Sequence, residues 1–367
     1  MENKIIKDSY MNPIIFINYL KKYVSGQDEA IEMLVTKVIT HFNRLNYEKS
    51  RKLPEIEGNI KNNILLIGPS GTGKTYMVNL LAKKLNVPFV IRDATKYSQT
   101  GFRGDDIETV VNDLYEISGK NIEKTEKGII FLDEFDKLAL VGDKDYSTGW
   151  EVQKSLLKII EGSEIKHNTF SLNENKTNEG AVINTKNILF IFAGAFPELP
   201  DIIGKRLNKN TVGFNKSTLI EKNDIIKNLN TNDLIKFGIE REILGRIPIV
   251  ITLNNLTRKD YYNIISNKYS SIINSKKRDF ASIGINLEFT APALKYIADK
   301  AYKENIGVRG IKKIIEQTLY PFERDLDFTN IKTIKVTKDI VQNPHKVLCH
   351  MIEKMEKESK ILNKNNY

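Results

Sequence analysis

The sequence predicts an α/β fold with a parallel sheet, followed by a second, smaller and mostly helical domain. Between Ile64 and Ile251, short apolar segments that read as buried strands alternate with patterns typical of helices. One of these segments, residues 187–195, is apolar on both faces, as expected for a central strand of a parallel sheet. After Thr257 helical spacing dominates, with short strand patterns at residues 286–289 and 331–336.

The most specific motif is a glycine-rich turn between an apolar strand, residues 64–67, and a helical pattern. It has the form G-x-x-x-x-G-K-[ST]. Because a buried strand precedes it and a helical pattern follows it, a phosphate-binding loop is a better interpretation than a turn without a ligand. Glycines let the backbone N–H groups turn inward towards phosphate oxygens, and the following helix directs its positive end to the same place. We therefore expect an ATP site in which Lys74 faces the β- and γ-phosphates and the Thr75 hydroxyl ligates Mg²⁺. The expected nucleotide-binding residues of this stretch are Gly68, Pro69, Ser70, Gly71, Thr72, Gly73, Lys74, Thr75 and Tyr76.

A second apolar strand, residues 128–132, ends in the carboxylates Asp133 and Glu134. Hydrolysis of a phosphoanhydride needs such groups opposite a phosphate loop. We expect Asp133 to hold Mg²⁺ and Glu134 to polarise the attacking water. On its own, an apolar strand that ends in Asp-Glu is weak evidence for an ATPase site. It is strong evidence when it follows a complete phosphate loop, as it does here.

Composition excludes several classes of protein. The 367 residues are enough for two or three domains, and Cys349 is the only cysteine, which excludes a disulfide framework and a cysteine-based zinc cluster. The net charge of +10 favours nucleic-acid binding only if the basic residues share one face, so we expect no nucleic-acid partner. Neither a membrane span nor a signal peptide is evident, and we expect a cytoplasmic, reducing environment without a membrane.

There are four further candidates, and three of them have a plainer alternative. The loop Gly101, Phe102, Arg103 and Gly104 presents an aromatic residue between glycines, or it is a turn with a tucked phenylalanine. Val24 contributes to an adenine pocket or to ordinary core packing. Arg246 has the chemistry of an arginine finger or forms a structural ion pair. Arg309 precedes a helical pattern, where it is well placed for phosphate.

Taken together, the motifs resemble the AAA+ ATPases, and within them the ClpX-type protein unfoldases. The resemblance extends from about Tyr23 to about Val336. HslU, a sister group, carries a large inserted domain after the acidic strand, and the polar segment 163–184, which we expect to be an exposed excursion, is too short for it. The motifs that agree are, in order, Gly26-Gln27, GPSGTGKT, GFRG, FLDEFDK, VQKSLLKIIEGS, ILFIFAGAF, DLIKFG, LGRIP and GVRG.

The resemblance implies a P-loop NTPase large domain, a small domain, and a homo-hexameric ring. In such a ring Arg246 reaches a neighbouring subunit's nucleotide, and Arg309 is the sensor of the small domain. The loop at Gly101–Gly104 would line the axial pore and grip unfolded or tagged protein substrates. Val212, Gly213 and Phe214 occupy the place of the tripeptide that docks on a ClpP-type peptidase.

The chain departs from the family pattern at several places. The four-cysteine zinc domain with which ClpX usually begins is not part of the sequence, so we expect no zinc. Phe102 and Arg103 stand where tyrosine and valine are usual, and Val212 replaces isoleucine. The family's pore-entrance motif, Arg-Lys-His, is represented only by the fragment Lys166-His167. The polar sensor residue that usually follows the central strand is not evident at residues 193–195.

These observations predict four segments and one main function. The segments are an N-terminal segment (1–22), a large α/β domain (23–254), a small domain (255–338) and a charged tail (339–367). The predicted function is ATP-dependent unfolding and translocation of polypeptides, coupled to a ClpP-type peptidase. The alternatives are a remodelling ATPase without a protease, a DNA-directed AAA+ loader and an ATP-binding scaffold without catalysis. The intact residues Lys74, Asp133, Glu134 and Arg246 argue against the scaffold.

Overall fold

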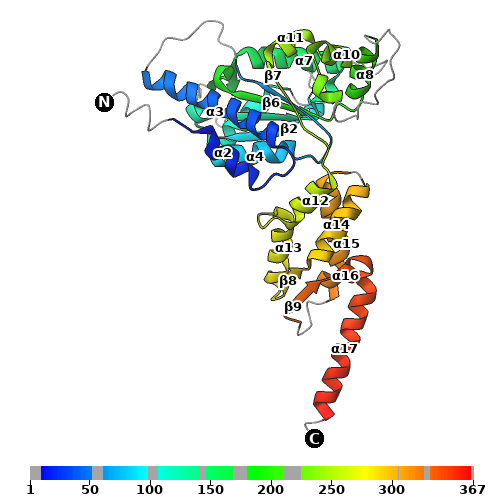
Figure 1. Cartoon of the computed structure of the whole chain (residues 1–367). Helices are drawn as coiled ribbons and strands as arrows, with labels where there is room; N and C mark the ends of the chain where they lie inside the picture. The colour runs from blue at the N-terminus through cyan, green and yellow to red at the C-terminus, as the bar shows by residue number, and fades with distance from the viewer. Residues whose placement is uncertain are drawn as a thin grey trace. The chain divides into compact units, whose positions relative to one another are not determined.

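A computed structural model of the chain describes residues 10–51, 61–97, 106–139, 146–167, 180–209, 225–304, 306–325 and 331–364. The chain divides into two compact units (Figure 1). The first comprises the residues up to Lys21, Gln27–Pro69 and Gly73–Asn255, and the second comprises Lys22–Gly26, Ser70–Thr72 and the residues from Leu256 onwards.

A five-stranded parallel sheet forms the centre of the first unit, with strand order β2-β3-β6-β1-β7. This confirms the predicted α/β class. Strand β6, predicted to be central, lies between β3 and β1, and all of its residues are buried. The strands are β1 (Ile64–Ile67), β2 (Phe89–Asp93), β3 (Ile129–Asp133), β6 (Leu189–Gly194) and β7 (Ile249–Thr252).

Helices cover both faces of this sheet, because successive strand residues point to opposite sides. Leu65, Ile130 and Phe190 share one core with residues of α5, α7, α8, α10 and α11, while Figure 1 draws α3 and α4 across the sheet from α7 and α11. The helices are α2 (Pro13–Lys21), α3 (Asp28–Arg51), α4 (Lys74–Leu85), α5 (Thr109–Ile117), α6 (Ile122–Thr125), α7 (Tyr146–Glu161), α8 (Leu199–Lys209), α10 (Thr231–Phe237) and α11 (Arg241–Arg246), with short 3-10 turns η1 (Ala94–Lys96), η2 (Phe135–Leu138), η3 (Thr185–Asn187) and η4 (Ile226–Asn228).

The segment 163–184 differs from the exposed excursion predicted for it. Its ends form an antiparallel pair of strands, β4 (Glu164–His167) and β5 (Ala181–Asn184). Ile165 and Ile183 face each other in this pair and are both buried in the core of the first unit. The interpretation as an exposed excursion was therefore wrong at both ends, and residues 168–179 lie outside the described part.

The second unit is mostly helical and has a core of its own. Its helices are α12 (Arg258–Ser266), α13 (Ser271–Ser282), α14 (Ala291–Glu304), α15 (Val308–Asp325), α16 (Lys338–Gln342) and α17 (Pro344–Lys364), and it has a parallel pair of strands, β8 (Asn286–Phe289) and β9 (Thr333–Val336). Ile340, Val341 and Leu348, in the segment predicted to be a charged tail, are buried in this core. Cys349, in α17, is exposed. Among the described residues, no helix is both long and apolar enough to span a membrane.

Candidate functional site

The glycine-rich turn joins β1 to α4, as its sequence predicts. Gly71 and Gly73 have φ angles of 76° and 101°, in the left-handed region that glycine adopts most readily. Gly68 is packed against Leu253, the residue after β7. A side chain does not fit here, since a Cβ on Gly68 would lie 2.7 Å from the Cβ of Leu253. Glycine is therefore required in this turn both by its conformation and by the close approach of the neighbouring strand.

Lys74 opens α4 and its side chain folds back into the turn. Its Nζ donates hydrogen bonds to the carbonyl oxygens of Gly68 (2.6 Å) and Pro69 (3.0 Å), and the residue is buried. A buried ammonium held inside a glycine-rich turn is placed to meet an anionic phosphate there. Tyr76, by contrast, is 36% exposed on the surface of α4.

The end of β3 lies beside the start of α4. The Thr75 hydroxyl donates a hydrogen bond to Asp133 Oδ2 at 2.9 Å, which joins two residues that are 58 positions apart. A hydroxyl and a carboxylate are hard oxygen ligands of the kind that Mg²⁺ takes from a protein, the remaining ligands being water and phosphate. Among the described residues, no group of three or more histidine, cysteine, aspartate or glutamate side chains could hold a metal ion.

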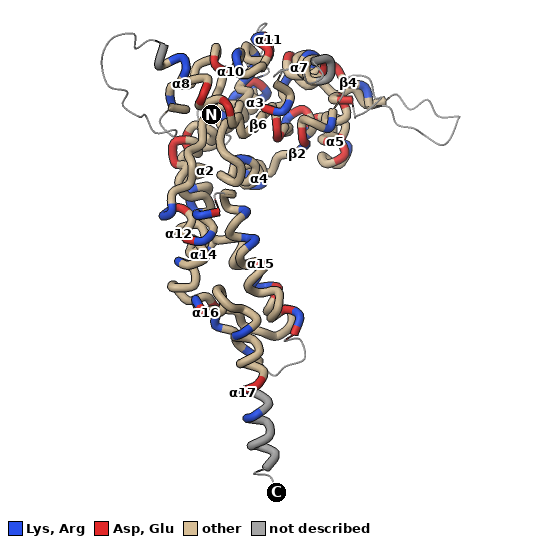
Figure 2. Tube along the Cα trace, turned by 90° about the vertical axis from the view of Figure 1, so that its right-hand side faces the viewer, with Lys and Arg blue, Asp and Glu red and all other residues tan. Residues whose placement is uncertain are grey.

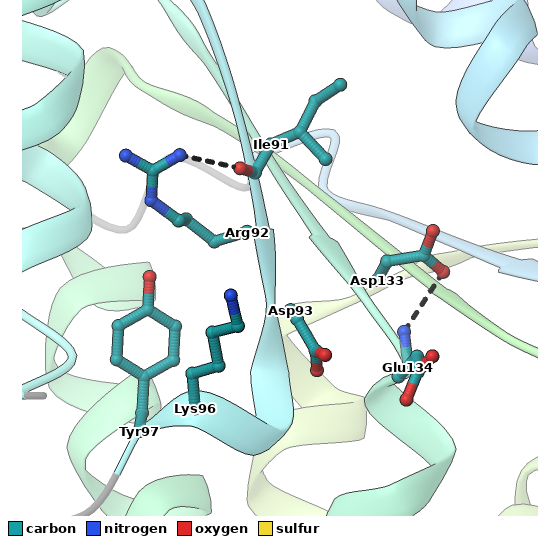
Figure 3. Close-up of a pocket in the computed structure, with 7 residues that line it drawn as sticks. All are labelled: Ile91, Arg92, Asp93, Lys96, Tyr97, Asp133 and Glu134. Carbon is teal, nitrogen blue, oxygen red and sulfur yellow. Dashed lines mark hydrogen bonds between the residues drawn. The ribbon is translucent and has the colours of Figure 1, made fainter. Parts of the chain in front are cut away.

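Glu134 follows Asp133 in a strained backbone conformation. Its φ angle is 57°, and its N–H donates to Asp133 Oδ1 at 3.0 Å. The residue is exposed, and it lines a pocket of about 390 Å³ together with Asp93 and Asp133 (Figure 3). A left-handed residue that is not glycine costs about 1–2 kcal/mol. In this conformation the backbone N–H of Glu134 is directed at Asp133, and the residue itself is exposed at the pocket.

Asp93 is a pocket residue that sequence reasoning did not select. It ends β2 in register with Asp133 at the end of β3. Figure 3 shows the carboxylates of Asp93, Asp133 and Glu134 on the same side of β2. Asp93 Oδ1 accepts hydrogen bonds from the backbone N–H and the hydroxyl of Thr95, at 2.9 and 2.7 Å. Its place at a strand end next to Asp133 was not visible because the strand order was not known.

Asp136 is a second residue that the sequence did not single out. It is buried in η2, and its two oxygens accept hydrogen bonds from the backbone N–H groups of Ala195 (3.2 Å) and Phe196 (3.3 Å). Phe196 has a φ angle of 50°, and a Cβ on Gly194 would lie 2.6 Å from Asp136 Oδ1. Asp136 therefore fixes the loop after the central strand, where no polar sensor was evident.

Arg246, the last residue of α11, lies in an ion pair on the surface of the first unit. Its Nε and Nη2 donate to Glu161 Oε1 at 2.7 and 2.6 Å, and its side chain is 56% exposed. Its backbone carbonyl accepts a hydrogen bond from Asn63 Nδ2 at 2.8 Å. Arg246 therefore forms an ion pair within its own chain, the alternative to an arginine finger, and its side chain is nevertheless exposed.

The remaining predicted site residues lie elsewhere. Val24 and Arg309 belong to the second unit, where Val24 is buried and Arg309 is exposed at the start of α15. Gln27, part of the Gly26-Gln27 motif, is buried in the first unit and exchanges two hydrogen bonds with the backbone of Asn254, at 2.8 and 3.0 Å. The residues expected in the pore loop and the docking loop, Gly101, Phe102, Arg103, Gly104, Val212, Gly213 and Phe214, lie outside the described part of the chain.

Comparison with known families gives two matches. The AAA domain (Cdc48 subfamily) matches residues 59–250, and the C-terminal, D2-small domain of ClpB protein matches residues 256–322. The first match includes β1, α4 and β3, and with them the four residues that the structure brings together, namely Lys74, Thr75, Asp133 and Glu134.

Curated relatives are similar over most of the chain. A protein of Bacteroides fragilis described as "ATP-dependent Clp protease ATP-binding subunit ClpX" is 36% identical over 338 residues, which cover 90% of this chain and 81% of the relative. Proteins with the same description from Borrelia duttonii and Porphyromonas gingivalis are 36% and 33% identical, over 89% and 92% of this chain and 77% and 83% of their own length.

Proposed function

Because this chain belongs to the ClpX family of AAA+ ATPases, and therefore binds and hydrolyses ATP, we propose that it uses this energy to unfold polypeptides and thread them through a ring of its own copies. The observation that carries the chemistry is the hydrogen bond between Thr75 and Asp133, with Glu134 beside it. This contact joins the phosphate loop to the acidic strand end, which is the arrangement that Mg²⁺-dependent hydrolysis requires.

Mg²⁺ would be held by Thr75 and Asp133, and it would neutralise the charge that develops on the phosphates. Lys74 would bind the β- and γ-phosphates from within the turn. Glu134 would accept a hydrogen bond from the attacking water and orient it in line with the γ-phosphate. These proposed roles are supported by the position of the residues, which lie in the turn and helix after β1 and at the end of β3, two strands of the same parallel sheet that are separated by β6.

The ring is proposed from Arg246. An exposed arginine on the large unit is suited to contact the nucleotide of a neighbouring copy, and its planar guanidinium matches a phosphate group. A contact from one copy into the site of the next is heterologous and closes into a ring, which we propose to be a homo-hexamer in the cytoplasm.

We further propose that the ring delivers its substrates to a ClpP-type peptidase. The relatives of this chain are described as subunits of an ATP-dependent Clp protease. In this chain the docking segment would be Val212, Gly213 and Phe214. The shorter side chain of Val212, compared with isoleucine, removes about one methylene from each contact, or about 0.8 kcal/mol where it is buried.

The test of this function separates gripping, docking and folding. Phe102→Ala should leave ATP hydrolysis nearly intact and abolish unfolding of a tagged substrate, whereas Phe102→Tyr should stay active. Phe214→Ala should retain unfolding and weaken each peptidase contact by about 1–3 kcal/mol, a loss that avidity around the ring multiplies. If instead both alanine variants lost ATPase activity and melting temperature together, the two residues would be ordinary core positions.

Two other functions predict different results in the same assays. A remodelling ATPase without a protease would unfold substrates without binding a peptidase through Val212. A DNA-directed loader would be stimulated by DNA rather than by unfolded protein, and it needs basic residues gathered on one surface. Within the described elements Figure 2 shows basic and acidic positions mixed, for example along α15, which favours the protein-directed function.

A further inference from the structure

The ion pair between Arg246 and Glu161 joins the last residues of two helices. Glu161 ends α7 and Arg246 ends α11, 85 positions later. Both contacts, from Nε at 2.7 Å and from Nη2 at 2.6 Å, go to the same oxygen, Oε1. A guanidinium is planar, so Nη1 lies on the opposite side of the group from this edge. The pair therefore fixes one edge of the arginine and leaves the other edge directed away from Glu161.

The backbone beneath Arg246 is held separately from its side chain. Asn63 is fully buried, and its Nδ2 donates to the Arg246 carbonyl while its Oδ1 accepts from the Phe190 N–H at 3.2 Å. Asn63 precedes β1, and Phe190 is in the central strand β6. The main chain at Arg246 is thus tied to the sheet, and Glu161 is left to determine where the guanidinium points.

Stability does not account for a carboxylate at position 161. The two side chains are 56% and 43% exposed, and an exposed ion pair contributes only about 0–1 kcal/mol. Glu161 is also at the negative end of a helix, where the aligned backbone carbonyls disfavour a further negative charge. Gly162, with a φ angle of 112°, turns the chain directly afterwards. A glutamate at position 161 therefore gains little stability, and its contact with Arg246 is the remaining reason for a carboxylate here.

We propose that Glu161 is a positioning residue that holds the Arg246 guanidinium in the orientation from which its Nη1 edge meets the ATP of the neighbouring subunit. This inference rests on the proposed function, in which Arg246 acts in the next subunit's site. An exposed arginine samples many rotamers and carries about 2 kcal/mol of rotamer entropy. Restricting it before the nucleotide is engaged leaves less ordering to be done in the transition state.

The first test is ATP hydrolysis by the full chain with Glu161→Gln, which keeps the shape of the side chain and removes its charge. We expect kcat to fall by up to about 100-fold, the scale of a catalytic group misplaced by about 1 Å, with an unchanged KM for ATP. Binding of a fluorescent ATP analogue and the melting temperature should match the parent. Glu161→Asp, which keeps the charge on a shorter side chain, should be intermediate.

The control is Glu123→Gln, which removes the exposed ion pairs of Glu123 with Lys49 and with Lys127 (3.0 Å) in the same unit. It should hydrolyse ATP at the parent rate. A parent-like kcat of Glu161→Gln would overturn the inference. A raised kcat would overturn it as well, because Glu161 would then restrain Arg246 rather than prepare it.

A double-mutant cycle separates this inference from the function on which it rests. Arg246→Ala should bind ATP and keep only a small residual rate of hydrolysis, and adding Glu161→Gln to it should not lower this residual rate further, since the two residues act as one unit. A further loss would overturn the inference while leaving the function standing. If Arg246→Ala alone hydrolysed ATP at the parent rate, the proposed action in a neighbouring subunit would fail, and the positioning role would fail with it.

Discussion

We propose that Lys74 and Glu134 have separable roles, which substitution should reveal. Lys74→Ala removes the buried charge that we propose to face the phosphates, so nucleotide affinity should fall. Glu134→Gln keeps the fold of the site and removes only the water-polarising carboxylate, so binding should persist while hydrolysis is lost. Titration with a labelled nucleotide and a phosphate-release assay measure the two effects. Hydrolysis at the parent rate in Glu134→Gln would refute the assignment of this residue.

Lys61 makes the stability of the first unit depend on pH. This lysine donates a hydrogen bond to the Thr185 carbonyl at 2.7 Å, and burial, together with the nearby Arg44, lowers its pKa from 10.5 to about 7. Between these values the unfolded chain binds a proton that the folded chain does not, so unfolding becomes harder as pH rises through this window. Below about pH 7 both states are protonated and the dependence ends.

The corresponding test is Lys61→Met, which removes the titrating amine. In urea unfolding, the stability of the parent relative to this variant should increase by about 2 kcal/mol between pH 7 and pH 9. This is somewhat less than the full slope of about 1.4 kcal/mol per pH unit would give, because the folded lysine is only half titrated at pH 7. Lys158→Met changes a lysine of the same unit whose side chain is 68% exposed, and it should leave the parent's pH dependence intact. A pH-independent difference for Lys61→Met would contradict the burial of a neutral amine.

At the scale of elements, Asp136 couples the end of β3 to the loop after β6. Asp136→Asn replaces one acceptor oxygen with an NH₂ group that faces a backbone N–H of Ala195 or Phe196. A buried donor without an acceptor costs about 1–3 kcal/mol, and we expect that loss of stability together with slower ATP hydrolysis. Differential scanning calorimetry and an ATPase assay measure both. The exposed Asp201→Asn in α8 is the control and should change neither.

The sequence predicted those parts of the site that depend on neighbouring residues. The phosphate loop and the acidic strand end are each a continuous strand with its following turn, so local pattern was sufficient to place Lys74, Thr75, Asp133 and Glu134 on these elements, while their roles stay predictions. Asp136 was missed because its partners, the N–H groups after β6, are about 60 positions away. An aspartate between apolar residues gives no sign of whether it is exposed or bonded to a distant backbone.

The same limit explains the errors at the scale of elements. Strands β4 and β5 are short, and each is marked by one buried isoleucine among polar residues, which is too little alternation to separate a strand from a loop. The pair of Arg246 with Glu161 was foreseen only as a generic alternative, because its partner is 85 positions away. Long-range pairs of this kind depend on the strand order, which local pattern does not determine.

At the scale of the whole molecule, two separate cores predict two unfolding transitions. In the second unit, Lys276 of α13 pairs with Glu316 (2.8 Å) and Glu323 (2.9 Å) of α15. Although burial acts to lower it, these hydrogen bonds raise the pKa of Lys276 above its ordinary value. Lys276→Gln should therefore lower only the transition of the second unit, since it leaves the carboxylates of Glu316, Glu323 and Asp279 without the cation that they share.

Calorimetry of three variants tests this independence. Asp136→Asn should shift the transition of the first unit, Lys276→Gln that of the second, and the exposed neighbour Lys277→Gln should shift neither. A loss of about 1 kcal/mol moves the melting temperature of a unit of 100 residues or more by about 2–8 °C, which is readily resolved. A single transition that both variants shift equally would mean that the two cores unfold as one cooperative body.

The exposed Cys349 has a practical consequence for studies of assembly. Since it is the only cysteine of the chain, a maleimide dye attaches once per copy without any substitution. The number of photobleaching steps of a single labelled particle then equals the number of chains that it contains. A population prepared with Glu134→Gln and ATP, in which the nucleotide is held but not consumed, would give the stoichiometry of the proposed ring by direct counting.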